Sequence, residues 1–546
     1  MKHHIKSKIQ KAIVGLLTIL TPLPWGGVGV GLVSCSDDFL DRTPEGDYNV
    51  DNYFTSDAAL DAATAPLYNR AWFQYNERAI VPIGSMRANE AYNPYMYPEF
   101  TTFQVTALTD LLTAAWGAFY TVVTMSNSVI ENIETRATSE CTIEAKQRNI
   151  AEARLMRGIA YFDMVRLWGP VVLTEKNETV VENPIQPLNR VEDVFEFIIR
   201  DFTYAAEHLP AKSASKGRAT KWAAEAFLAK VYLARSGWDK ATRDENDLAK
   251  ARQYAADVCN NSGLELLPNY EDLFKYKFNN NDESLLAMQW VPLGGWYVSN
   301  TLYADLCFSS EITGGVGVWG GHQATIDQLH QYETADTLRR NATFFTQHSY
   351  YPYINIAQGG YSYNHTQAHL KKGAIGGPDD DNDGKIESMS SPLNTYIIRL
   401  ADVYLTYAEA CLGNSERLSN GEGLEYFNKV RDRAKIERKT SITLDDIIRE
   451  RRCEFGMEYV NWYEFTTWYK WQPRKMLRYM NSQDRGSRCD EITKAADGTL
   501  VFNESKISRP NIVIEVSDDN IFFPYPEVDV IQNPLLKQAP QPYNFQ

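Results

Sequence analysis

The feature that most constrains the fold is a set of apolar residues at helical spacing in both flanks of the chain. Over residues 144–168 the apolar side chains recur every three or four positions, and Gly169-Pro170 ends the pattern. A second pattern covers residues 220–235, with Thr220 as its N-cap and Gly237 just past its end. Because an α-helix turns every 3.6 residues, each pattern predicts an amphipathic helix whose apolar face needs a partner.

Paired helices with a short connection are expected in the C-terminal half. Residues 400–411 carry an apolar stripe that Gly413-Asn414 closes, and another stripe follows at 424–434. A further helix begins near Thr443, where Thr443 and Asp446 resemble a capping box. Helix pairs of about 34 residues are the size of a tetratricopeptide (TPR) unit. The sequence thus predicts a mainly α fold built from TPR-like helical hairpins, with an irregular helical bundle as the alternative.

The middle of the chain has a different composition. From about residue 287 to 392 it is rich in Gly, Tyr, Trp, Asn and Ser, and no helical period is sustained. No linker divides the chain, so we expect one domain, residues 35–546, with residues 287–392 as a loop-rich insertion. Loops held on a rigid scaffold are where binding residues concentrate, so ligand contacts are expected in this insertion.

The first 34 residues have the order of a lipoprotein export signal. Four lysines precede an apolar stretch at residues 12–20, and Leu32-Val33-Ser34 lead directly to Cys35. That stretch is shorter than the roughly 20 residues that a membrane-spanning helix needs. We therefore predict that residues 1–34 are a signal peptide and that Cys35 is lipidated, for example with palmitate. An ordinary secretory peptide with an incidental Cys35 is the alternative.

Charge and cysteine content limit the classes of partner and site. The net charge is −15, and cleavage after residue 34 would remove four lysines and no acidic residue, which gives −19. Such an acidic chain argues against a nucleic-acid partner, because phosphate binding relies on clustered Lys and Arg. No CxxC pair is present, which argues against a zinc site. Cys259, Cys411 and Cys453 fall in helical apolar patterns, so we expect buried thiols rather than a disulfide framework.

A series of short motifs, in order along some 500 residues, resembles the SusD/RagB-like nutrient-binding outer-membrane lipoproteins. Each motif alone is weak evidence, but their shared order is specific. The motifs lie at Cys35–Pro44, Ala65–Asn69, Trp116–Tyr120, Ala151–Arg157, Val165–Pro170, Gly217–Thr220, Lys230–Leu233, Asn281–Ser284, Arg399–Leu405, Tyr407–Ala410, Asn428–Arg431, Glu450–Phe455, Phe523–Glu527 and Asn533-Pro534.

The resemblance implies a function outside the cell. It implies a lipid-anchored protein on the outer-membrane surface that delivers a glycan to a SusC-like TonB-dependent transporter. Residues Ser36-Asp37-Asp38 are similar to the surface-export signal of the family. Members of the family handle glycans or peptides, so a peptide-binding, RagB-like role is the open alternative.

Aromatic residues in two loop regions are the candidates for ligand contact. Residues 92–97 place three tyrosines around a proline, and Trp296 and Trp319 lie in a glycine-rich stretch. Trp and Tyr rings stack on the apolar faces of sugars, while Asn or Arg side chains such as Arg87 and Asn89 bond the hydroxyl rim. Core packing is the alternative for each aromatic residue, but the resemblance adds an early aromatic-Asn loop at the family's ligand site. The predicted ligand-binding residues are Tyr92, Asn93, Tyr95, Trp296 and Trp319.

An acidic turn in the insertion suggests a metal site. Residues 379–384 read D-D-D-N-D-G, which matches the D-x-D-x-D-G start of a calcium loop. The twelfth position is Ser390 where a bidentate Glu is usual, and Glu387 stands at the ninth. A calcium site formed by Asp379, Asp381, Asp383 and Glu387 is the hypothesis, and a solvated acidic turn is the alternative. We expect no other cofactor.

Motifs of catalysis are missing from the sequence after the leader. It contains no G-x-S-x-G, H-E-x-x-H or P-loop motif. His365 and His369 are four apart, but their polar neighbours favour a loop over a helical metal site. Among 70 acidic residues, neighbouring carboxylates are unavoidable and identify no glycosidase pair. We expect a binding protein, with a glycan-degrading enzyme and a scaffold for protein partners alone as the alternatives.

Overall fold

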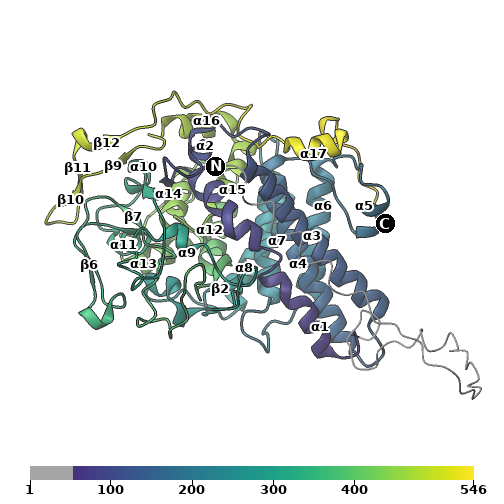
Figure 1. The fold of residues 1–546 in the computed structure, drawn as a ribbon. Helices are drawn as coiled ribbons and strands as arrows, with labels where there is room; N and C mark the ends of the chain where they lie inside the picture. Colours follow the sequence, from purple (N-terminus) through teal and green to yellow (C-terminus); the bar gives the residue numbers. More distant parts are fainter. Residues whose placement is uncertain (1–52, 546) are drawn as a thin grey trace, which may run out of the picture. The chain divides into compact units, whose positions relative to one another are not determined.

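Long helices pack against one another in chain order through the first half of the protein. The structure is a computed structural model that describes residues 53–545. α3 packs on α4, α4 on α6, α6 on α7 and α7 on α8, while the short α1 lies against α4 (Figure 1). The helices are α1 (Asp57–Thr64), α3 (Asp110–Arg136), α4 (Ile143–Trp168), α6 (Val191–His208), α7 (Lys221–Gly237) and α8 (Glu245–Asn261).

A second group of helices closes on this stack. α12 packs against α7, α8, α13 and α14, and α15 reaches α4 and α7. The array therefore continues from α8 to α12 and α13 although about 140 residues separate α8 from α12 in sequence. These helices are α12 (Leu400–Leu412), α13 (Glu422–Ala434), α14 (Leu444–Glu454), α15 (Asn461–Trp471) and α16 (Pro473–Ser482). The predicted mainly α fold with helical hairpins is confirmed.

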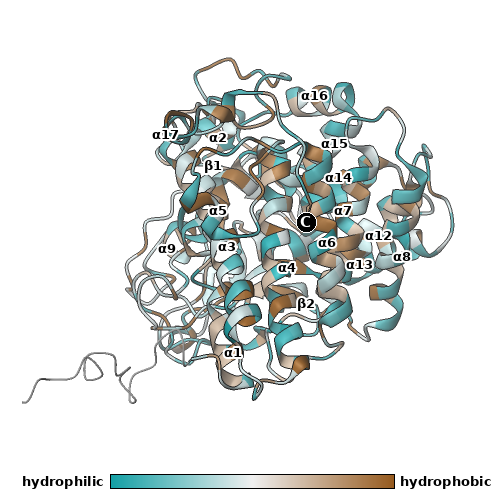
Figure 2. Ribbon diagram, turned by 90° about the vertical axis from the view of Figure 1, so that its right-hand side faces the viewer, coloured by the Kyte–Doolittle hydropathy of each residue, from teal (hydrophilic) through white to brown (hydrophobic). Residues whose placement is uncertain are grey.

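Local signals set the helix ends. The Thr142 side chain accepts a hydrogen bond from the Ala145 amide at the start of α4, and Gly169, with a φ of 79°, ends that helix. The Thr443–Asp446 capping box is present at the start of α14. Figure 2 shows brown and teal stretches on the same helices, as the amphipathic patterns predict.

The loop-rich insertion begins and ends at one pair of strands. β2 (Ser284–Met288) pairs antiparallel with β8 (Thr395–Arg399), so the chain leaves and re-enters the helical body at the same place. Between them the chain forms short elements joined by irregular loops. These elements are α9 (Tyr303–Leu306), β3 (Gln323–Ala324), α10 (Ile326–Leu329), α11 (Thr337–Thr343), β4 (Phe344–Phe345), β5 (Ser349–Tyr351), β6 (Tyr361–Tyr363) and β7 (His369–Leu370).

The remaining strands are two or three residues long. A four-stranded sheet of order β1-β3-β7-β4 links the early loop to the insertion, and the other sheets pair β5 with β6, β10 with β11 and β9 with β12. The elements not yet given are β1 (Ala91–Tyr92), α2 (Pro98–Thr102), α5 (Asn177–Glu182), β9 (Arg488–Cys489), β10 (Ile492–Lys494), β11 (Leu500–Phe502), β12 (Ile507–Ser508) and α17 (Glu527–Gln532).

Buried ion pairs join these parts within a largely apolar core. Arg399, at the end of β8, is 1% exposed and contacts Glu283 and Glu454 at 2.6 Å each and Glu458 at 2.8 Å. Burying charges is costly unless each finds a partner, and here one guanidinium serves three carboxylates. The network fixes the entry to the insertion against α14.

The cysteines agree with the expectation from sequence in part. All six cysteines of residues 53–545 are free thiols, and Cys453 is buried, whereas Cys259 and Cys411 are only partly buried. In that same part of the chain, no helix combines the length and the apolar character needed to span a bilayer. Cys35 and the predicted signal peptide lie outside the described residues.

Candidate ligand-binding site

Four aromatic side chains of the predicted regions are exposed. Tyr95 is 92% exposed, Trp296 51%, Tyr297 48% and Trp319 49%. Large aromatic rings at the surface of a protein with an extensive core mark a binding surface when they lie together. The contacts of the neighbouring elements show how these four rings are placed.

The β1–β3 pairing brings the tyrosine loop to the second tryptophan. Tyr92 pairs with Gln323, and a Cβ added at Gly321 would lie 3.2 Å from the side-chain nitrogen Nδ2 of Asn93. The loop after β1 therefore lies beside residues 319–321. Asn93 accepts a hydrogen bond of 3.0 Å from the Tyr95 amide, which fixes the start of the turn that presents the Tyr95 ring.

A carboxylate holds the edge of Trp319. Its indole nitrogen donates to Asp305 of α9, and its amide donates to the Ala304 carbonyl at 2.9 Å. Burial raises the pKa of Asp305, while the indole hydrogen bond and the nearby Arg78 act in the opposite direction. One edge of the Trp319 ring is thus fixed, and half of its surface stays open to a ligand.

Trp296 packs on a buried ring from a different segment. Phe73 is 2% exposed and contacts both Trp296 and Tyr297 edge to face, with ring centroids 5.2 Å apart in each case. Tyr297 has a φ of 74°, which is rare for a residue with a side chain and costs about 1–3 kcal/mol. Such strain concentrates at functional sites, because surrounding contacts must hold it in place.

The segment around residues 73–78 lies near the groups that support both tryptophans. Phe73 supports Trp296, and Arg78 lies within electrostatic range of Asp305, which holds Trp319. Arg78 also interacts with Tyr97 of the tyrosine loop. Residues 75–79 form a π-helical turn, an irregularity often found at functional sites. We call Tyr95, Trp296, Tyr297 and Trp319 the aromatic platform.

Other predicted contact residues are buried instead. Tyr92 is 7% exposed and Asn93 1%, so both support the loop from below. Arg87 and Asn89 are 1% and 0% exposed, and Asn89 accepts a hydrogen bond from the Gly486 amide. The expectation that Arg87 and Asn89 bond a sugar rim therefore does not fit the structure, where core packing encloses both.

Several supporting residues carry no recognisable signal in the sequence. Asp305 follows no motif, and Phe73 lies more than 200 residues before the tryptophan that it supports. Tyr297 is adjacent to Trp296, and the Trp-Tyr pair in a glycine-rich stretch was the available signal for it.

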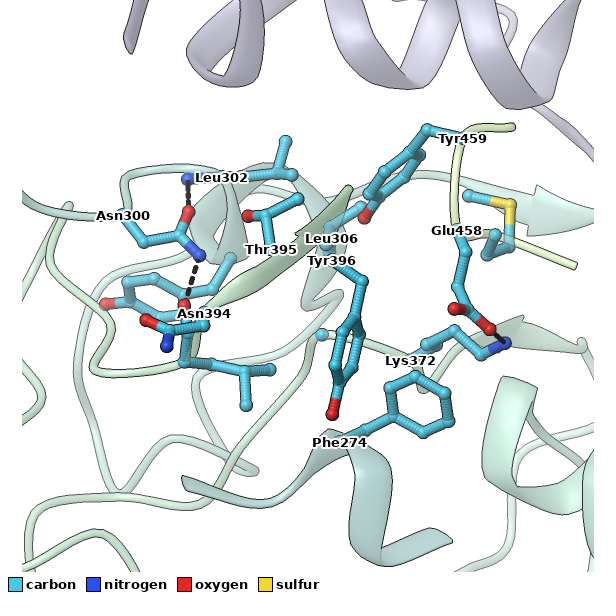
Figure 3. A pocket seen from close by; sticks show the side chains of 14 residues that line it. Phe274, Asn300, Leu302, Leu306, Lys372, Asn394, Thr395, Tyr396, Glu458 and Tyr459 are labelled. Carbon is cyan, nitrogen blue, oxygen red and sulfur yellow. Dashed lines mark hydrogen bonds and ion pairs between the residues drawn. The ribbon is translucent and has the colours of Figure 1, made fainter. Parts of the chain in front are cut away.

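A small cavity behind the insertion is not a sugar site. It has a volume of about 40 Å³ and lies between Asn300, Tyr396 and the Lys372–Glu458 ion pair (Figure 3). Burial lowers the pKa of Lys372 to about 8, although Glu458 partly offsets this. Small-molecule pockets are typically 300 Å³ or more, and a void of this size suits a few waters at most.

The acidic turn does not gather its carboxylates. Asp381 pairs with Lys277, and Asp383 lies 3.7 Å from Lys385. Asp380 instead accepts hydrogen bonds from the amides of Asn355, Ile356 and Gly377. Across residues 53–545, no group of three or more His, Cys, Asp or Glu residues is placed to hold a metal ion. Calcium binding by Asp379, Asp381, Asp383 and Glu387 stays a prediction, which calorimetry on chelated protein tests.

The two histidines lie on irregular and strand segments. His369 belongs to β7, its ring stacks on Phe308 at 4.2 Å, and burial lowers its pKa to about 4. Neither histidine lies in a helix, so the two share no helix face that could hold a metal ion.

Comparisons with known proteins agree with this architecture. A model described as the SusD family matches residues 270–542, and one described as starch-binding associating with outer membrane matches residues 38–233. A SusD-like protein of Bacteroides ovatus is 62% identical over 525 residues, which cover 94% of this chain and 96% of the relative.

Solved structures show the same fold. A protein crystallised with xylogluco-oligosaccharide is 62% identical, with a TM-score of 0.85 over 89% of this chain and 100% of that one. A laminarin-binding SusD-like protein is 20% identical, with a TM-score of 0.64 over 88% of this chain and 98% of that one. At that lower identity the likeness concerns the fold alone.

Proposed function

The chain belongs to the SusD family, and from this premise we propose that it binds xyloglucan-type oligosaccharides on the aromatic platform. The observation that carries the proposal is the exposed set of Tyr95, Trp296 and Trp319 around one segment, in a chain 62% identical to a protein crystallised with such a ligand. Sugar rings present apolar C–H faces, and indole and phenol rings stack on them. The platform suits several consecutive sugar residues.

Affinity electrophoresis and calorimetry with xylogluco-oligosaccharides test this proposal. We expect binding by the wild type and loss of binding in a Tyr95→Ala/Trp296→Ala/Trp319→Ala variant. Tyr350→Ala is the matched control, because Tyr350 is 56% exposed in β5, outside the platform. Unchanged affinity in the triple variant would refute the placement. Binding of a peptide panel without glycan binding would favour the RagB-like alternative.

The proposal includes delivery and anchoring. A lipid on Cys35 would hold the protein at the outer-membrane surface, and a SusC-like TonB-dependent transporter would take up the captured oligosaccharide. The order of the leader up to Cys35 and the family membership support this part. Co-purification of the transporter with the tagged protein from its own cells tests the partnership.

The proposed role is capture without bond cleavage. The platform is formed by aromatic rings, and the carboxylate beside it, Asp305, is engaged by the Trp319 indole. Incubation with xyloglucan followed by chromatography of the products tests this point. Release of shorter oligosaccharides would overturn it in favour of a glycan-degrading enzyme.

A further inference from the structure

A cavity opens between α3, α5 and α17, in the helical part of the molecule. Its volume is about 350 Å³, within the range of about 300–1,000 Å³ that is typical of small-molecule pockets. α5 and α17 both contact α3, and the Asn533 side chain after α17 donates to the Gln186 carbonyl at 2.7 Å (Figure 1). None of the four platform residues lines this cavity, so it is a separate feature of the surface.

Apolar side chains form most of the cavity wall. They include Trp116 and Tyr120 of α3 together with Val172, Val180, Val181 and Leu536. The Tyr120 hydroxyl already bonds the Val172 backbone, because it donates to the carbonyl at 3.0 Å and accepts from the amide at 3.1 Å. The tyrosine therefore contributes its ring, and the wall suits a hydrocarbon chain.

Aliphatic side chains continue from the cavity onto the surface. Val181 is 81% exposed, Ile531 71%, Val528 53% and Ile185 47%. Val181 lines the cavity itself, and Val528 and Ile531 belong to α17, whose Asp529 also lines it. Single exposed aliphatic residues are common, but a group of them around a hollow marks an interaction site. We call Val181, Ile185, Val528 and Ile531 the aliphatic rim.

Asp529 places a carboxylate in this apolar wall. Within residues 53–545 the carboxylate makes no ion pair and no hydrogen bond with another residue. Partial burial raises the pKa of Asp529. A carboxylate in an apolar wall is poorly solvated, and a cation beside it would offset that cost.

The surface around the cavity is acidic. Glu178 and Glu182 of α5 are exposed and make no ion pair in the part of the chain that the structure describes. Lys537 is held by Glu527 at 3.8 Å, and Lys176, just before α5, is exposed. With the carboxylate of the cavity, the unpaired charges are mainly negative, so the surface complements a basic partner.

A lysine or arginine side chain combines the two features that the cavity offers. Its hydrocarbon stem can lie along the apolar wall, and its cationic head can meet the Asp529 carboxylate and the aromatic rings of α3. A neutral sugar would leave the carboxylate without a cation and the aliphatic rim in water. A free amine of small size would also leave the rim uncovered, so the features together fit a protein segment.

We propose that the cavity and the aliphatic rim form a docking surface for the transporter, which inserts a lysine or arginine side chain beside Asp529. Apolar neighbours of that side chain cover the rim and exclude water from the charge pair. The identity of the partner rests on the proposed function, whereas the position and chemistry of the surface rest on the cavity.

Co-purification of the transporter with the tagged full-length protein from its own cells tests the proposal. Asp529→Asn should lower the transporter recovered per tagged protein by about fivefold or more, while Asp529→Glu keeps the charge and most of the recovery. Val181→Ser/Ile531→Ser removes two side chains of the rim and should cause a similar loss. Val501→Ser/Val513→Ser is the matched control, because these valines are 50% and 94% exposed away from the cavity.

Further outcomes separate the possible failures. The purified variants should keep the wild-type thermal unfolding, because the changed side chains are exposed or unpaired. If the wild type recovers the transporter and either Asp529→Asn or the rim variant recovers as much, the docking surface is overturned and delivery stands. Absence of the transporter from the wild-type sample would overturn both. Equal loss in the control variant, or a wild-type dimer that the rim variant abolishes, would also overturn the docking surface, the latter in favour of a second copy.

Discussion

In the aromatic platform, the Asp305 carboxylate supports the Trp319 ring. The indole edge is fixed by the carboxylate, so the ring can meet a sugar without first losing conformational freedom. Trp319→Ala should therefore weaken oligosaccharide binding by about 1–3 kcal/mol, which is roughly fivefold to 150-fold in affinity. Asp305→Asn keeps an acceptor and should stay within about twofold of the wild type, whereas Asp305→Ala should lose more. Calorimetry on the three variants measures this, and equal losses for Asn and Ala at position 305 would contradict it.

Glu225 makes stability depend on pH. It is 7% exposed, and one carboxylate oxygen has no hydrogen-bond partner in the described part of the chain. Burial, then Asp257, raises its pKa from 4.5 to about 7. The folded state therefore holds a proton that the unfolded state releases above pH 4.5. Proton binding by Glu225 therefore adds to the free energy of unfolding. This stabilisation is fully present below pH 4.5 and is lost as the pH rises through about 7.

The variant Glu225→Gln isolates this effect. It cannot titrate, so the melting temperature of the wild type should fall relative to that of the variant as the pH rises from about 4 to about 8. Thermal unfolding at a series of pH values measures the difference. Glu131→Gln, on the exposed face of α3, should follow the wild type. If the difference in melting temperature between the wild type and Glu225→Gln did not change with pH, the pKa of Glu225 would not be raised.

At the scale of elements, the contact between α9 and residues 319–321 positions the platform. A Cβ at Gly320 would lie 2.6 Å from the Cys307 carbonyl oxygen and 2.7 Å from that of Asp305. These are backbone atoms, so Gly320→Ala must push the two segments apart and move Trp319. We expect a loss of about 1–3 kcal/mol in stability together with weaker oligosaccharide binding.

Gly317 provides a matched control on the same loop. Its added Cβ would meet only the Ser388 hydroxyl, at 3.8 Å, which is an ordinary contact. Gly317→Ala should therefore keep both stability and affinity. Urea unfolding and calorimetry on the two variants test the argument, and equal behaviour of the two alanine variants would refute it.

The sequence predicted the helices better than the strands. The limits of α4, the hairpin of α12 and α13, and the cap of α14 follow from spacing and capping residues within a few turns of the chain. The β1–β3 pair joins two-residue strands that lie more than 220 residues apart, and no local pattern encodes it. That pair decides which loops form the site.

The same limit explains the mixed result for the site residues. Tyr92 and Tyr95 are three residues apart in one aromatic loop, yet one is buried and the other is 92% exposed. Their exposure depends on the partner strand β3, not on their own neighbours. Sequence reasoning could select the two regions, but only the tertiary structure separates the supporting residues from the exposed ones.

For the whole molecule, buried charges hold the two groups of helices together. Lys230 of α7 contacts Asp402 of α12 at 2.8 Å and Glu464 of α15 at 2.7 Å, and all three side chains are largely buried. Lys230→Met would leave two carboxylates without this cation and should lower the free energy of unfolding by about 3–5 kcal/mol. Urea unfolding measures the loss. Lys240→Met, at an exposed ion pair of 4.0 Å, should cost less than about 1 kcal/mol.

Attachment of the whole protein to the membrane is predicted to depend on Cys35. The leader ends at Cys35, which is the residue that lipoprotein processing would acylate. Each acyl CH₂ buried in the bilayer contributes about 0.8 kcal/mol, and several chains on one cysteine give firm attachment. In cells, the wild type should fractionate with the outer membrane and be cleaved by external protease, whereas Cys35→Ala should leave the membrane fraction. Cys259→Ala is the control and should stay membrane-bound, because its thiol lies within α8. A Cys35→Ala protein that still fractionates with the membrane would show that the lipid is not the anchor.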